Sequence, residues 1–460
     1  MVRLNLNRPQ IMLIAACSLF AVVAVYRLVL TAPPTPQIAS SVPNAASADL
    51  TDAQAIRSLT GSADTASAIV NLQQRIKQNP NAPSLYSQLG WAFLQRAREN
   101  ADPTNYVQAQ QAFDAALQKD SQELDAILGQ GSLALSRHHF DKAIEWGEKA
   151  KVINPFRAQI YGVIGDGLVE MGRYEDATNM MQKMVDTRPD LNSYSRVSYI
   201  RELNGDMKGA IEAMKIAVQS GNPLHEGTLW SMYQLGNLYF NSGNLTEAEK
   251  AYSNALQIKP GYIYARAGRA KVWAAQGHMQ QAIEEYRQIN ETLPLPEFVI
   301  ALGDLYQING NTAEAKSQFD LVRVIQKLNA DAAMDVDMEL ALFEADHLPD
   351  PTQLASASTE ANAIVTRARA AYERRPSIYA ADVLAWALYK TGQFEEAAKY
   401  SAESLKLGTR DAMLHFHAGM IALGLNDEAT AKKHLQTALE INPHFSVRYA
   451  EKTKEALAGL

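Results

Sequence analysis

A period of about 34 residues runs through most of this chain and constrains its fold more than any other feature. Prolines mark the period in steps of 34, 34, 37 and 34 residues, at Pro155, Pro189, Pro223, Pro260 and Pro294. A series of alanines repeats the pattern: Ala143, Ala177, Ala210, Ala248, Ala282, Ala315 and, after an interruption, Ala397 and Ala431. A fixed period of this length predicts a solenoid in which each unit packs mainly on its neighbours.

The clearest unit, residues 232–260, reads as two helices joined by a turn. Gly236 and Ala248 are small, which suits a close crossing of the two helices, whereas Tyr239 and Tyr252 can fill the gaps to neighbouring units. In six units a glycine stands where the first helix should end, because a left-handed residue is easiest for glycine: Gly172, Gly205, Gly243, Gly277, Gly310 and Gly392. No useful alternation of polar and apolar residues appears, so we expect an all-α body.

This unit resembles the tetratricopeptide repeat, through Leu235-Gly236, Tyr239, Ala248, Tyr252, Ala255 and Pro260. The resemblance implies a right-handed superhelical solenoid of antiparallel helix pairs, with a concave groove lined by the first helices. Residues 61–460 hold about nine to ten units, with a leading helix at 66–78 and a capping helix at 446–458. The units are expected at 83–121, 124–156, 158–190, 191–223, 229–261, 262–294, 296–328, 335–375, 378–409 and 412–444. A Pro-, Ala- and Ser-rich insertion, 348–358, interrupts the most degenerate unit and has no assigned role.

Residues 11–30 form an apolar run broken only by Arg27, and a helix of this length spans a bilayer. Arg3 and Arg8 precede the run, so the positive-inside rule places residues 1–10 in the cytoplasm and the body outside it. We favour an uncleaved signal anchor of a bacterial cell membrane, crossed once. A lipoprotein signal ending at Cys17 and a cleaved secretory signal stay open as alternatives. Residues 31–60 begin as an uncharged Pro-, Ala- and Ser-rich stretch, typical of an extended linker.

The charge balance argues against nucleic-acid binding. Of 460 residues, 43 are Lys or Arg and 50 are Asp or Glu, a net charge of −7, whereas a nucleic-acid surface needs a basic stripe. The single cysteine, Cys17, excludes intramolecular disulfides and cysteine zinc sites.

No motif of an enzyme or cofactor site appears, so we expect no catalytic residue, no cofactor and no metal. The histidines have plainer interpretations. His138 and His139 read as solvated turn residues, His417 as a packed core residue and His347 as a helix-end residue beside free carbonyls. His415 and His417 do not share a helix face, so they are poorly placed to chelate.

The groove is the better candidate for function. On the family pattern, the concave positions of the middle units are Ser195, Tyr199 and Glu202, then Tyr233, Asn237 and Phe240, then Ala267, Lys271 and Ala274. Trp230 and Tyr264 border the same surface, and Asp382, Trp386 and Tyr389 form a similar trio near the C-terminus. Aromatic side chains with a few amides and charges suit an extended peptide or a partner helix. Some of these aromatics could instead pack between units.

The resemblance also disfavours one ligand. Family members that grip acidic C-terminal tails use a clamp of two Lys, two Asn and one Arg, and Asn237 occupies one clamp position while Tyr233 stands where a Lys is needed. The sequence therefore predicts a non-enzymatic scaffold or adaptor that binds a protein or peptide segment. An accessory subunit of an envelope complex, such as secretion, cytochrome-maturation or cell-wall machinery, is the alternative. The oligomeric state stays open.

Overall fold

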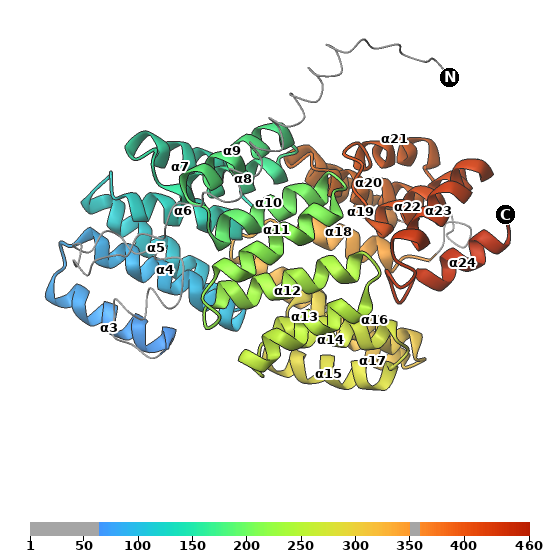
Figure 1. Ribbon diagram of the computed structural model, residues 1–460, viewed down its shortest axis with the longest axis horizontal. Coiled ribbons are helices and arrows are strands. Elements are labelled where there is room, and N and C mark those ends of the chain that lie inside the picture. Colours follow the sequence, from blue (N-terminus) through green and yellow to red (C-terminus); the bar gives the residue numbers. More distant parts are fainter. Residues whose placement is uncertain (1–63, 350–358) are drawn as a thin grey trace, which may run out of the picture. The chain divides into compact units, whose positions relative to one another are not determined.

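The computed structural model describes residues 64–349 and 359–460, and this part of the chain contains helices and turns but no strand (Figure 1). The expected anchor at 11–30, the whole of the 31–60 linker region and residues 350–358 of the insertion lie outside the described residues. Within the described ranges, no helix has both the length and the apolar character needed to cross a membrane. The all-helical solenoid expected from the repeat is confirmed.

Ten antiparallel helix pairs follow one another in the described part of the chain, between a leading helix and a terminal one. The leading helix is α3 (Thr65–Gln78) and the terminal helix is α24 (Ala450–Ala458). The first helices of the pairs are α4 (Pro83–Asn100), α6 (Leu124–Ser136), α8 (Ala158–Glu170), α10 (Leu191–Leu203), α12 (Glu226–Asn241), α14 (Ile263–Ala275), α16 (Pro296–Ile308), α18 (Asp337–Asp346), α20 (Ile378–Lys390) and α22 (Ala412–Gly424). The second helices are α5 (Thr104–Lys119), α7 (Phe140–Ile153), α9 (Tyr174–Thr187), α11 (Met207–Ser220), α13 (Leu245–Ile258), α15 (Met279–Thr292), α17 (Thr312–Asp331), α19 (Thr359–Arg374), α21 (Phe394–Ser404) and α23 (Glu428–Ile441).

The turn inside each pair follows the glycine pattern. All six glycines expected to end a first helix have a positive φ, from 69° at Gly172 to 84° at Gly277. The prediction for these turns is confirmed. The same turn is left-handed at His138 and Asn426, with φ values of 60° and 58°. The solenoid therefore imposes this geometry even where no glycine relieves its steric cost.

In two places an aromatic side chain of a second helix fills the space between its own unit and the next. Tyr252 is fully buried, and a Cβ added at either Gly236 of its own unit or Gly268 of the next would overlap its ring. Phe113 is enclosed in the same way by Gly90 and Gly129. The glycines at these four positions are thus required because an aromatic ring from the second helix occupies the space between successive first helices.

Contacts between residues roughly 200 positions apart join successive turns of the superhelix. His138 Nδ1 lies 2.8 Å from the carbonyl oxygen of Asp335, the Tyr174 hydroxyl accepts from the Ile378 amide at 2.7 Å, and Asn442 donates to the Phe240 carbonyl at 2.8 Å. The Thr409 hydroxyl donates to the Leu203 carbonyl in the same series. We call these contacts the inter-turn seam. Their separations of 197 to 206 residues, divided by 34, give about six units per turn.

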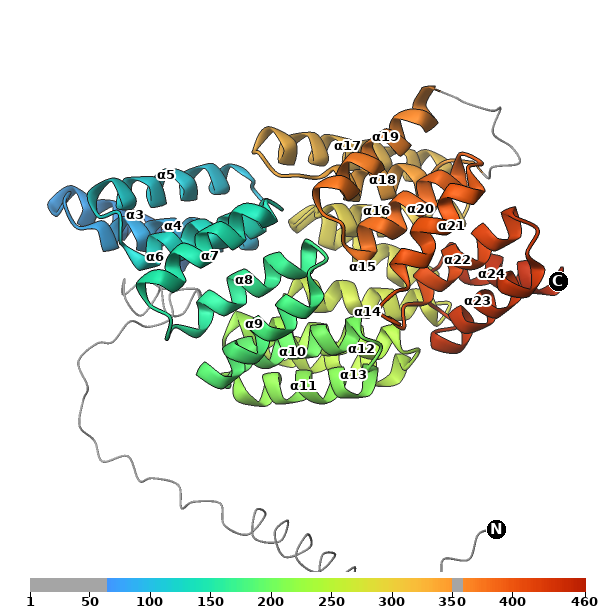
Figure 2. The ribbon, with the colours of Figure 1, turned by 90° about the horizontal axis from the view of Figure 1, so that it is seen from above.

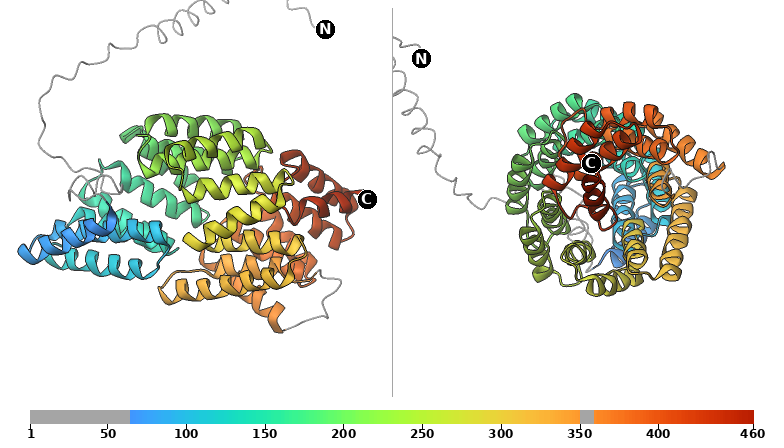
Figure 3. Two further views of the ribbon diagram at one scale, coloured as in Figure 1. Left: turned by 90° about the horizontal axis from the view of Figure 1, so that it is seen from below. Right: turned by 90° about the vertical axis from the view of Figure 1, so that its right-hand side faces the viewer.

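Seen end-on, the described helices, from α3 to α24, surround a central space (Figure 3, right). The view from above shows the α8–α14 arc and the α16–α22 arc on either side of it (Figure 2). The C-terminal helix α24, in dark red, overlaps the centre of the ring in the end-on view, whereas the side view places it at the C-terminal end of the superhelix (Figure 1). A capping helix was expected at 446–458, and α24 occupies residues 450–458.

Candidate functional site

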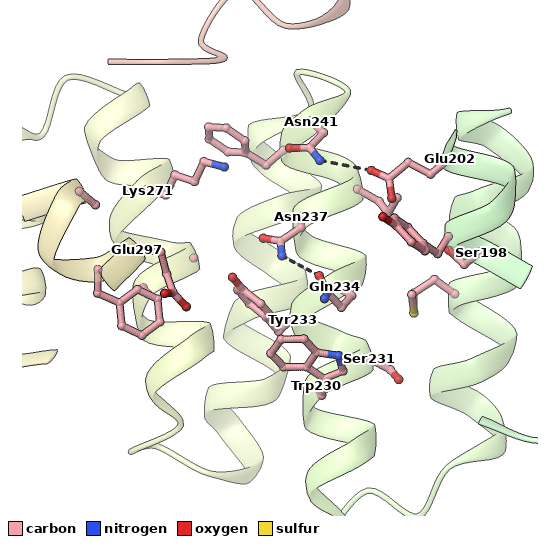
Figure 4. A pocket seen from close by; sticks show the side chains of 18 of the residues that line it. Ser198, Glu202, Trp230, Ser231, Tyr233, Gln234, Asn237, Asn241, Lys271 and Glu297 are labelled. Carbon is pink, nitrogen blue, oxygen red and sulfur yellow. Dashed lines mark hydrogen bonds between the residues drawn. The ribbon is translucent and has the colours of Figure 1, made fainter. Parts of the chain in front are cut away.

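The concave side of the central units encloses a cavity of about 820 Å³. Its walls come mainly from the first helices α10, α12, α14 and α16, which turn their inner faces toward one another (Figure 4). The volume lies within the roughly 300–1,000 Å³ typical of ligand pockets. Nine concave positions derived from the repeat pattern line this one cavity: Ser195, Tyr199, Glu202, Tyr233, Asn237, Phe240, Ala267, Lys271 and Ala274.

Aromatic side chains form one end of the α12 wall. Trp230 keeps 36% of its surface exposed and lies 5.2 Å from the Tyr233 ring and 5.0 Å from the Tyr264 ring, centroid to centroid. Trp230 and Tyr233 line the cavity, whereas Tyr264 supports them from behind and packs on Phe298 at 5.9 Å. Phe240 contributes only an edge, since it is 2% exposed. The aromatics therefore divide between cavity surface and packing between units.

A chain of hydrogen bonds fixes the polarity of the same wall. The buried Tyr252 hydroxyl donates to Asn237 Oδ1 at 2.7 Å, and Asn237 Nδ2 donates to Gln234 Oε1 at 2.8 Å. Burial raises the pKa of Tyr252, which keeps the phenol protonated and available as a donor. With its oxygen occupied by Asn237, Gln234 offers its amide N–H groups to the cavity. The part of α12 around Gln234 is therefore preorganised to bind a carbonyl oxygen.

Lys271 of α14 is the cavity cation that lacks a carboxylate partner among the described residues. Its Nζ lies 4.1 Å from the centre of the Phe240 ring, a cation–π distance. Lys271 is exposed to the cavity, and desolvation by the surrounding cavity walls lowers its pKa to about 8. A further cation, Arg196, is paired with Asp166 at 2.7 Å at the α8 end of the cavity.

Carboxylates stand on both sides of Lys271. Glu202 of α10 accepts a long hydrogen bond, 3.4 Å, from Asn241. Burial raises the pKa of Glu202 to about 7, the Asn241 bond opposes this shift, and the Asp411 carboxylate adds to it. Burial likewise raises the pKa of Glu297, in the first turn of α16. The wall therefore offers an aromatic surface, amide donors and separated charges of both signs.

The C-terminal segment completes the cavity from the next superhelical turn. We call residues 442–449 the strap, because they run from α12 to α16 and His444, Phe445, Ser446 and Val447 line the cavity on the way. Asn442 is 1% exposed and bonds to the Phe240 carbonyl at one end. At the other end Arg448 donates to Asp304 at 2.7 Å and to Gln307 at 2.8 Å. No local sequence signal pointed to this segment, since its partners lie 141 to 202 residues away.

The trio near the C-terminus does not form an open groove surface, and that expectation was wrong. Asp382, Trp386 and Tyr389 are 5%, 1% and 6% exposed. Trp386 stacks on His417 at 4.0 Å and meets the Tyr449 ring edge-on at 5.9 Å, so the strap end and the neighbouring helix α22 cover it. The repeat pattern gives the same positions here as in the middle units, but α22 and the end of the strap occupy the space above them.

The histidines follow their plainer interpretations with one correction. His417 is buried and its Nδ1 lies 2.9 Å from Asp382, while His347 Nδ1 lies 2.6 Å from the Phe343 carbonyl near the end of α18. His138, expected as a solvated turn residue, instead contacts Asp335 across the inter-turn seam. His415 and His434 approach within 2.9 Å, and burial lowers the pKa of His415 to about 4. The described residues contain no group of three His, Cys, Asp or Glu placed to hold a metal.

Paired helices stacked around a concave cavity define a helical-repeat protein with an enclosed concave face. Family models of the tetratricopeptide repeat match residues 94–158, 230–262 and 383–444, in phase with the 34-residue period. The chain therefore contains tetratricopeptide repeats in these three stretches.

Similar proteins cover the chain only in part or at low identity. ETO1-like protein 2 of Arabidopsis thaliana is 26% identical over 129 residues, which are 27% of this chain and 14% of that protein. The chain thus spans a small part of the length of that relative. The thermophilic TPR protein TTC0263 of Thermus thermophilus is 21% identical, with a TM-score of 0.37, over 42% of this chain and all of that one. The human IFIT1 dimer is 15% identical, with a TM-score of 0.45, over 77% and 81% of the two chains.

Proposed function

We propose that this protein is a non-enzymatic scaffold whose central cavity binds a peptide or a segment of a partner protein. The α12 wall carries the proposal, because Trp230, Tyr233 and Gln234 place aromatic surface beside fixed amide donors inside a concave cavity. Aromatic anchors supply most of the binding energy at such sites, and amide donors match the carbonyl groups of a peptide backbone. Lys271 and the flanking carboxylates add charge selectivity.

A pull-down from envelope extract with the tagged full-length chain tests this function. We expect the wild type to retain a partner that Trp230→Ala combined with Tyr233→Ala loses, because the double substitution removes the aromatic surface of the cavity. A matched control replaces two outward residues, Phe156→Ala with Leu224→Ala, which are 84% and 74% exposed. Retention of the same partner by the cavity variant would show that the cavity is not the binding site.

The proposal includes the location of the body. Residues 11–30 tether the chain to a bacterial cell membrane, residues 31–60 act as the linker, and the solenoid works outside the cytoplasm. The composition of the two segments and the basic residues before the apolar run support this. Carbonate extraction of membranes should leave the chain in the pellet, and protease added outside the cytoplasmic membrane should degrade the body.

The three fates of the N-terminal segment give different results in the same fractionation. A signal anchor keeps the chain in the membrane with its N-terminal tag intact and tolerates Cys17→Ser. A lipoprotein loses its attachment with Cys17→Ser, and a secreted protein loses the tag and appears in the soluble fraction. Either of the last two results would replace the proposed anchor.

A further inference from the structure

The outer face of α17 differs from that of its neighbours. This helix has 20 residues where α13 and α15 have 14. Leu321, Val324 and Leu328 are 36%, 55% and 53% exposed, and their spacing places them on one side of the helix. The helix lies at the periphery of the solenoid (Figure 2). The result is an apolar stripe of three residues on a surface that α13 and α15 keep polar, whereas α7 and α11 expose only single apolar residues at the equivalent positions, Val152 and Ile216.

The repeat pattern does not require apolar residues at the positions of this stripe. When the helices are aligned on Ala315, Ala248 and Ala282, the positions of Leu321 and Val324 carry polar residues in both neighbours: Asn254 and Gln257 in α13, Gln288 and Glu291 in α15. The buried positions of α17, such as Ala315 and Val322, follow the pattern, so only its outer face has changed. An apolar stripe on one helix favours contact with another helix face.

The charges beside the stripe indicate which helix packs against it. Lys316, Asp320, Lys327 and Asp331 flank it on one side, and all four are exposed, with Lys316 paired to Asp320 and Lys327 to Asp331 within the helix. In an antiparallel pair of identical helices related by a two-fold axis, the same flank of each copy meets the other. An axis near Val324 places Leu321 against Leu328 of the second copy, Asp320 against Lys327, and Lys316 against Asp331. Every flanking charge then faces its opposite.

The remaining charge of this stretch does not oppose the pairing. Arg323 stands close to the axis, where two copies would bring like charges together. Its guanidinium carbon lies 5.5 Å from the centre of the Phe343 ring, and its Nη1 lies 3.1 Å from Asp320. Both contacts hold the group within its own chain and away from the axis.

We propose that the α17 stripe is a self-association surface, on which two copies of this chain pair through antiparallel α17 helices. A single helix pair buries less than the roughly 1,200 Å² of a stable standard interface. The dimer is therefore weak, and forms where copies are concentrated. The surface lies outside the cavity, so two cavities act together in the pair.

Cysteine cross-linking tests the geometry, because the natural chain has only Cys17. In full-length Cys17→Ser protein in a mild detergent, Val324→Cys should form a disulfide-linked dimer on mild oxidation, since residues at the axis come within bonding distance. Gln257→Cys, on the outer face of α13, is the matched control and should stay monomeric. Equal dimer yields from the two positions would overturn the proposal, as would cross-linking of Val324→Cys to another protein in an extract.

A charge exchange tests the orientation independently. Lys327→Asp in the Val324→Cys background should lower the dimer yield about tenfold, because like charges then face each other across the pair. Adding Asp320→Lys reverses both partners and should restore the yield. Restoration is expected only for antiparallel pairing about this axis. A double variant that stays monomeric while retaining the thermal midpoint of the wild type would contradict the proposed surface.

Discussion

Arg448 Nη1 lies 2.7 Å from Asp304 Oδ1, and the two residues are 144 positions apart in the chain. The pair fastens the strap to α16, with side chains 17% and 14% exposed. Arg448 also donates to the carbonyl oxygen of Asp346 at 2.8 Å, so one side chain joins the strap, α16 and the end of α18. The wall of the cavity therefore depends on a contact between segments about four repeat units apart in the chain.

Replacing Arg448 by alanine should loosen the strap and destabilise the fold. Loss of one partner leaves the half-buried Asp304 charge with fewer donors, and we expect unfolding to become easier by about 3 kcal/mol. Urea denaturation measures this, and Arg287→Ala, which breaks an exposed ion pair with Glu284, should leave the urea midpoint nearly unchanged because solvent screens that pair.

The same variant should open the cavity. A cysteine placed at Ala274 in Cys17→Ser protein reports access to the wall, and its labelling by a thiol reagent should be faster when Arg448 is replaced. Equal labelling rates with and without Arg448 would show that the strap does not control entry.

Substitutions at two glycines distinguish the stability that depends on the left-handed turn from the stability that depends on the inter-turn seam. Gly172 and Gly277 have φ values of 69° and 84°, but an added Cβ would meet the Pro376 carbonyl at Gly172 and open space at Gly277. Gly277→Ala should cost about 1–2 kcal/mol from the backbone alone. Gly172→Ala should cost about 1–3 kcal/mol more, because it also forces the two turns apart. Identical unfolding free energies in urea would mean that the inter-turn seam contributes little.

The raised pKa of Glu202 predicts a pH dependence of stability. Its folded value of about 7 exceeds the ordinary 4.5. Between those values the folded chain retains a proton that the unfolded chain has lost, so the unfolding free energy falls as pH rises through this window. Glu202→Gln carries no ionisable group at this position, so it lacks this pH-dependent loss of stability. Relative to wild type, the variant should therefore gain stability in urea between pH 4.5 and pH 8.

An exposed control separates this effect from a general one. Glu212→Gln, on the outer side of α11, should shift the urea midpoint equally at both pH values. If the unfolding free energies of Glu202→Gln and wild type differ by the same amount at every pH in this range, the raised pKa of Glu202 does not cause the pH dependence.

Local contacts explain why so much of the fold and the middle of the site follow from the sequence. Gly236, Tyr252 and Gly268 meet because they lie within one repeat length of each other, and the repeat pattern records such contacts directly. For the same reason, the concave positions on α10, α12 and α14 could be assigned from the period and came together in one cavity.

The contacts that the sequence did not reveal are all long-range. Asn442 with Phe240 and Arg448 with Asp304 depend on the pitch of the superhelix, which sums small rotations over many units. No residue pattern of 34 positions encodes that sum. The burial of Trp386 by the returning tail has the same origin, which is why its exposure was predicted wrongly.

The most direct test of the central claim is photo-cross-linking from the cavity wall in living cells. A photoreactive amino acid at Gln234, which faces the cavity, should give a discrete covalent adduct with a partner protein. The same group at Gln257, on the outer face of α13, should not give that adduct. An adduct from Gln234 alone is the result that our account predicts. Adducts only from Gln257, or none from Gln234 in cells that contain the partners, would contradict the claim that the cavity binds protein segments.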